Sequence, residues 1–86
     1  MPTISMFYGI TIRMYNNGEH NPPHFHAYYQ GHEAVFDMDG NMTEGEMPRA
    51  KVKLITAWAE IHRDELIANW ELAIHEEPLY RIEPLR

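Results

Sequence analysis

The first clear pattern in the chain is an alternation of apolar and polar side chains over residues 10–15. A period of two residues is typical of a strand that buries one face. The buried face would carry Ile10, Ile12 and Met14, and the opposite face would carry Thr11, Arg13 and Tyr15. The turn-forming residues between 16 and 23, which end in Pro22-Pro23, predict a surface loop after this strand.

Residues 24–29 and 32–38 predict a hairpin closed by Gln30-Gly31. A two-residue loop fixes the opposed pairs as His24 with Asp37, Phe25 with Phe36, His26 with Val35, Ala27 with Ala34, Tyr28 with Glu33, and Tyr29 with His32. In this register the small and aromatic apolar residues fall on one face, and the histidines, Tyr28 and the acids fall on the other together with Val35. A slip by one residue would mix the two sets, which supports the pairing. Asp39-Gly40 then predicts a turn into a short fourth strand over residues 41–44.

The chain changes to a helical pattern at Pro48, after which no proline occurs until Pro78 and no glycine at all. A mostly apolar stripe recurs at intervals of three and four and consists of Val52, Ile55, Ala59, His62, Leu66, Asn69 and Ala73. One helix over residues 49–76 would be about 42 Å long, and a break near residues 61–64 with Asp64 as its cap is the alternative. Leu79, Ile82 and Leu85 would let the tail fold back onto the core.

These elements predict a single α+β domain over residues 1–86, because the chain is too short for two domains. We expect strands and hairpins over residues 1–47, helix over 48–77 and an extended tail over 78–86. The expected fold is a small antiparallel meander of three to four strands, packed against one long or kinked C-terminal helix.

Charge and composition argue against several classes of function. The chain has 13 acids against 7 bases and a net charge of −6, which argues against non-specific nucleic-acid binding. It has no cysteine, so disulfides and a thiol nucleophile are excluded. It shows no long apolar run and no signal-peptide pattern, so we expect a cytoplasmic protein that does not enter membranes.

The histidines suggest a metal site. His24 and His26 would project side by side from one face of a strand, with Asp37 opposite His24 and with His20 four residues upstream. Three histidines and a carboxylate would suit a divalent transition metal such as zinc, iron, manganese or nickel. The alternative is that these are ordinary strand histidines, with His24 and Asp37 paired for sheet stability.

The same face also permits catalysis without a metal. His24 and His26 could act as general acid and base, Asp37 could orient His24, and Arg13 could bind a phosphate. A ribonuclease needs roughly this equipment, while a solvated polar sheet face needs none of it. Whether the chain is an enzyme therefore stays open on the residues alone.

The chain resembles the bacterial and archaeal domain-of-unknown-function 4160 family over nearly its whole length. The residues that carry the resemblance are Met1–Ser5, Phe7–Ile10, Pro22–His26, Trp58–Leu66 and Asn69–Ala73. The resemblance marks Pro23–His26 as the family signature and implies a short stand-alone protein encoded beside another small protein, as in toxin–antitoxin pairs. We therefore expect a small binding or regulatory module with a protein partner or a second copy as its ligand. The alternative is a metal-dependent hydrolase or ribonuclease that uses the same histidines.

Overall fold

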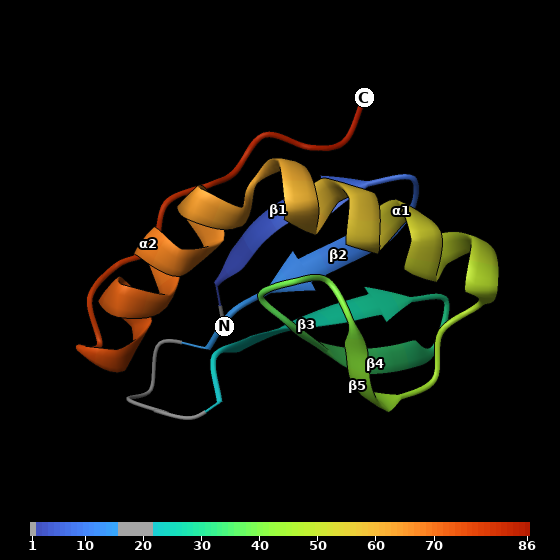
Figure 1. Cartoon of the computed structure of the whole chain (residues 1–86), viewed down its shortest axis with the longest axis horizontal. Coiled ribbons are helices and arrows are strands. Elements are labelled where there is room, and N and C mark those ends of the chain that lie inside the picture. Colours follow the sequence, from blue (N-terminus) through green and yellow to red (C-terminus); the bar gives the residue numbers. More distant parts are fainter. Residues whose placement is uncertain (1, 16–21) are drawn as a thin grey trace.

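The computed structural model describes residues 2–15 and 22–86 and shows an α+β fold (Figure 1). A five-stranded antiparallel sheet has the strand order β1-β2-β3-β4-β5, and two helices follow it. The strands are β1 (Thr3–Phe7), β2 (Ile10–Arg13), β3 (His24–Tyr29), β4 (His32–Asp37) and β5 (Met42–Gly45), and the helices are α1 (Arg49–Ile61) and α2 (Arg63–Ile74). The predicted meander is confirmed, since each strand pairs with the next one along the chain.

The central hairpin confirms the register expected from the sequence. All six opposed pairs of β3 and β4 are as predicted, from His24 with Asp37 to Tyr29 with His32. Gln30 and Gly31 both have positive φ angles, of 43° and 83°, as the favoured two-residue hairpin turn requires. Burial alternates along both strands, so the histidines of β3 lie on the opposite face from Phe25 and Ala27.

The expectation of three to four strands is wrong, because it omits β1. A bulge between Thr3 and Ser5 interrupts the pairing of β1 with β2. As a result Ile4 and Ser5 are both buried, and the alternation that would have revealed the strand is lost. The turn that follows, Tyr8-Gly9, has positive φ at both residues but lacks the Asn-Gly or Asp-Gly signal of a tight hairpin.

The expectation of one long helix is also wrong. The chain has two helices, and the break between them falls within residues 61–64, the range given above as the alternative. His62, with φ −108° and ψ 26°, leaves the helical conformation and separates α1 from α2. Asp64 is not the cap, because it lies in the first turn of α2 and His62 occupies the capping position. The His62 ring binds Glu65 through Nδ1 at 2.6 Å. The second helix ends at Ile74, three residues before the end of the helical segment predicted over residues 48–77.

The core lies between the sheet and the helices. Trp58 of α1 is fully buried, and its ring contacts Phe7 at 5.3 Å and Phe25 at 5.8 Å between centroids. The predicted return of the tail is confirmed: Ile82 is buried and its N–H donates to the carbonyl of Ile4 at 2.7 Å. The Trp58 indole donates to the carbonyl of Glu83 at 2.8 Å, which holds the tail against α1.

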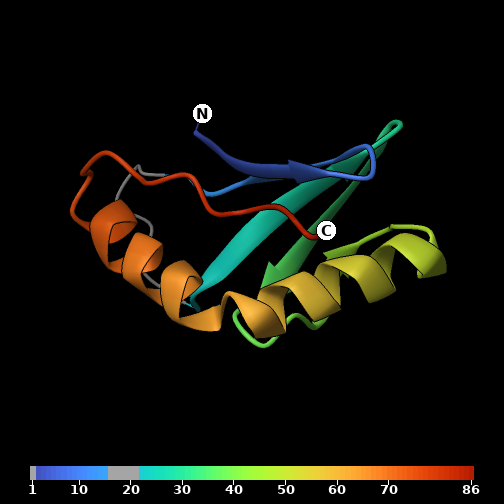
Figure 2. The ribbon, with the colours of Figure 1, turned by 90° about the horizontal axis from the view of Figure 1, so that it is seen from above.

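Both helices and the C-terminal tail lie on the same side of the sheet (Figure 2). The opposite face is not covered by any helix or strand in residues 2–15 and 22–86. Within the same ranges, neither helix has the length and apolar character needed to cross a membrane. The fold therefore leaves one face of the sheet uncovered, and that face carries the two histidines of β3, His24 and His26.

Candidate functional site: the polar sheet face

The uncovered face of β2, β3 and β4 forms a continuous surface that we call the polar sheet face. Its members are Thr11, Arg13, Tyr15, His24, His26, Tyr28, Glu33, Val35 and Asp37. Pairing between β2 and β3 places Arg13 directly opposite His26 and Thr11 opposite Tyr28. The sequence predicted that these residues share a face, and the pairing confirms it.

Aromatic rings pack edge to face at the centre of this surface. The Tyr15 and His26 rings are 4.5 Å apart between centroids, and the His24 and His26 rings are 5.3 Å apart. A hydrogen bond joins the Tyr15 and Tyr28 hydroxyls. Because of these contacts the His26 side chain is only 16% exposed, although no described element covers the face. The rings are therefore held in place before any ligand binds.

Arg13 lies over the Tyr28 ring of this aromatic layer. Its guanidinium carbon lies 5.0 Å from the centre of the Tyr28 ring, a cation–π contact. Its Nε donates to the Thr3 hydroxyl at 3.4 Å, which anchors it to β1. Burial, followed by the hydrogen bond to Tyr15, raises the pKa of Tyr28, so its phenol stays neutral at physiological pH.

The two histidines differ in their surroundings. His24 Nδ1 donates to the carbonyl of Pro22 at 2.7 Å, and the His24 ring lies 5.2 Å from Trp70 of α2. His26 Nδ1 lies 3.9 Å from Glu33, within ion-pair range when the imidazole is protonated. His24 therefore sits where the polar sheet face meets α2, and His26 sits within the face.

Asp37 has a role in the turn after β4 that the sequence did not suggest. It pairs with His24 in the register, but its Oδ1 accepts N–H bonds from Asp39 and Asn41, each at 2.9 Å. The carboxylate therefore stabilises the turn between β4 and β5. His24 Nδ1 is bonded to the carbonyl of Pro22, and the predicted pairing of Asp37 with the His24 ring stays a prediction.

The metal hypothesis stays a prediction. His20, one of its four ligands, lies outside the described residues. Among the residues that the structure does describe, no group of three or more histidines and acids is arranged to hold a metal ion. The described part of the predicted ligand set thus offers His24 and His26 side by side, with Asp37 engaged in its turn.

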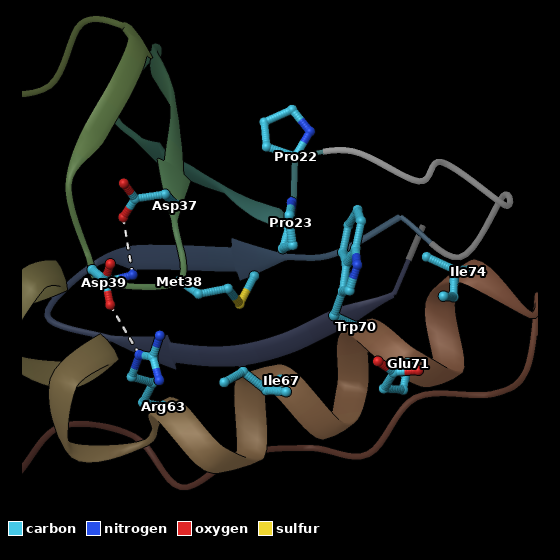
Figure 3. Close-up of a pocket in the computed structure, with 10 residues that line it drawn as sticks. All are labelled: Pro22, Pro23, Asp37, Met38, Asp39, Arg63, Ile67, Trp70, Glu71 and Ile74. Atoms are coloured by element: carbon cyan, nitrogen blue, oxygen red, sulfur yellow. Dashed lines mark hydrogen bonds and ion pairs between the residues drawn. The ribbon is translucent and has the colours of Figure 1, made fainter.

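The sequence did not predict a groove of about 580 Å³ between α2 and the start of β3 (Figure 3). Apolar side chains from α2 line one wall, Pro22 and Pro23 line another, and the turn after β4 supplies acids. A signal was present, because Ile67, Trp70 and Ile74 recur at intervals of three and four beside the buried stripe of α2. The buried residues of α2 and the row of Ile67, Trp70 and Ile74 together give this helix a wider apolar surface than the sheet covers.

Fold and site together define a small α+β protein with one open sheet face rich in tyrosine and histidine. The chain belongs to the family described as Domain of unknown function (DUF4160), whose model matches residues 9–71. The match runs from the turn before β2 into α2 and therefore includes the polar sheet face. Comparisons with curated proteins and with solved structures returned no match.

Proposed function

We propose that the chain is the binding module of a small regulatory pair of the toxin–antitoxin type, and that it binds its protein partner through the polar sheet face. The observation that carries this proposal is the open face itself. The helices and tail pack on one side of the sheet, while the other side presents ordered rings and Arg13 to solvent.

The composition of the face supports a protein ligand. Tyrosine and arginine are enriched at the centres of protein interfaces, where they supply most of the binding energy. Met6 of β1 pairs with Thr11, so it belongs to the same side of the sheet, and it is 57% exposed. Exposed apolar area beside aromatic and arginine side chains is typical of a binding surface. The order of the rings lowers the entropy lost on binding.

The test is the affinity for the protein encoded by the neighbouring gene, measured by titration calorimetry. Arg13→Glu should weaken binding by about 30-fold, or ~2 kcal/mol, as expected for a central arginine. Arg81→Glu is the matched control, because Arg81 is exposed and lies on the C-terminal tail, whose neighbouring residues Ile82 and Glu83 bond to Ile4 and to Trp58. Equal affinities for wild type and Arg13→Glu would refute the proposal.

Two further variants separate binding from folding. Arg13→Lys keeps the charge but loses the planar contact with Tyr28, so we expect an intermediate loss of affinity. Thermal unfolding followed by circular dichroism checks that each variant is folded at the temperature of the titration. A loss of affinity that disappears once the unfolded fraction is subtracted would count against the polar sheet face as the binding surface.

The second proposal is an enzyme, either a ribonuclease or a metal-dependent hydrolase. It is favoured by the 5.3 Å separation of the His24 and His26 rings and by the position of Arg13 opposite His26. Two adjacent imidazoles and a guanidinium are suited to acid–base cleavage of a phosphodiester. RNA cleavage by wild type that persists at the same rate in His24→Ala and His26→Ala would remove both histidines from the mechanism.

Metal analysis tests the metal-dependent hydrolase, which is the other form of this second proposal. Protein purified without a polyhistidine tag should carry about one equivalent of a divalent transition metal if His24 and His26 are ligands. The double variant His24→Ala/His26→Ala should lose that metal. Substoichiometric metal that is unchanged in the double variant would refute a resident metal.

A further inference from the structure

We propose that the groove between α2 and the start of β3 binds a peptide segment of a partner protein in which an apolar side chain is flanked by lysine or arginine. This site adjoins the polar sheet face where the His24 ring contacts Trp70, but the inference does not depend on the function proposed for that face. It rests on the shape, the apolar floor and the charge of the groove.

The floor of the groove is apolar. Ile67, Trp70 and Ile74 of α2 line one wall, and Met38 and the two prolines line the other parts (Figure 3). The spacing of three and four residues on α2 places these three side chains in one row along the helix. A volume of about 580 Å³ lies within the range of sites that enclose a small ligand or several side chains.

The rim of the groove is acidic. The lining contains one base, Arg63, and three acids, which are Asp37, Asp39 and Glu71, so it carries a net charge of −2. Arg63 is already engaged, because its Nε donates to Asp39 at 2.9 Å. The carboxylate of Glu71 lies on the α2 side of the groove, on an exposed residue. The rim therefore favours a cationic flank beside the inserted apolar side chain and disfavours an acidic one.

The charge also argues against a second copy of this chain as the occupant. The chain has a net charge of −6, and the groove adds a local negative potential to an approach between two acidic molecules. A basic segment of another protein gains from the same potential. The negative charge of the groove therefore favours a basic segment of another protein, and the apolar floor of the groove binds the apolar side chain of that segment.

The walls of the groove are ordered without a ligand. The Asp37 carboxylate accepts N–H bonds from Asp39 and Asn41 and so fixes the turn that forms one side. Pro22 and Pro23 restrict the backbone on the other side. A groove with fixed walls loses little entropy when a segment docks, which is the condition for useful affinity from a short peptide.

The experiment is selection of peptides from a random linear library displayed on phage, with the wild-type full chain as bait. We expect enriched peptides to carry an apolar residue next to lysine or arginine. They should bind wild type and Glu60→Arg alike, and bind Glu71→Arg at least about tenfold more weakly. Glu60 is the matched control because it is an exposed acid on α1 outside the groove.

A second readout locates the peptide. In the wild type a bound peptide should shift the NMR signal of the Trp70 indole N–H and leave that of Trp58, which is bonded to Glu83, unchanged. The Arg13→Glu variant should bind the peptides with wild-type affinity, which separates binding in the groove from binding at Arg13 on the polar sheet face. Enrichment of acidic peptides, equal binding to Glu71→Arg, no enrichment at all, or a dimer of the chain that Glu71→Arg abolishes would each overturn the proposal.

Discussion

Asn69 holds the C-terminal tail against α2, and removing its side chain should cost a measurable part of the stability. The residue is 2% exposed; its Nδ2 donates to the Tyr80 carbonyl at 2.8 Å, and its Oδ1 accepts from the Tyr80 N–H at 3.0 Å. Two such bonds contribute about 1–3 kcal/mol together. Alanine regains about 0.5 kcal/mol through its higher helix propensity. We therefore expect Asn69→Ala to lower the free energy of unfolding by about 0.5–2.5 kcal/mol.

Asn69→Asp should cost more than the alanine variant. It keeps the acceptor for the Tyr80 N–H but places a carboxylate against the Tyr80 carbonyl at a buried position. Urea unfolding followed by circular dichroism measures both losses, and faster tryptic cleavage after Arg81 would report release of the tail. Asn41→Ala is the control, because Asn41 is exposed and its backbone N–H bond to Asp37 survives the change. A loss below about 0.5 kcal/mol in Asn69→Ala, or one no larger than in the control, would refute this account of the tail.

The remaining predictions concern the sheet. Gly45→Ala should destabilise the protein more than Gly31→Ala in urea unfolding. Both glycines have positive φ, but only at Gly45 would the new Cβ clash with a backbone atom, the carbonyl oxygen of Glu33. Equal losses would contradict this packing of β5. Folding raises the pKa of Tyr28 above its ordinary value of 10.0, so the unfolded chain releases this proton first and stability should fall as pH rises past about 10. Tyr28→Phe should remove that part of the fall, and an unchanged pH profile would contradict the burial argument.

The sequence was most informative where one face of a strand is buried and the turn is short. The pairing of β3 with β4 followed from two facts, a two-residue loop and the separation of apolar from polar side chains. The assignment of Arg13 to the same face as His26 followed from the alternation in β2. Most of the candidate site could therefore be predicted from local patterns.

Features that depend on contacts between distant residues could not be predicted in this way. The bulge in β1 hides the alternation of that strand, and only its pairing with β2 reveals it. The helical pattern continues through residue 62, and the geometry of that single residue separates α1 from α2. The hydrogen bonds from the Asp39 and Asn41 N–H groups to the Asp37 carboxylate depend on the geometry of the turn after β4, which the sequence pattern did not reveal. The groove arises from the position of α2 beside Pro22 and Pro23, which no local pattern reports.

The most direct test of the polar sheet face follows the histidine ring signals by NMR while the protein encoded by the neighbouring gene is added. His24 and His26 lie on the proposed interface, whereas His32 lies at the tip of the hairpin and His75 at the end of α2. We expect the Cε1–H signals of His24 and His26 to shift or broaden at stoichiometric partner, with those of His32 and His75 unchanged. Binding that moves His75 and leaves His26 in place, or an excess of partner that moves none of the four, would contradict the account.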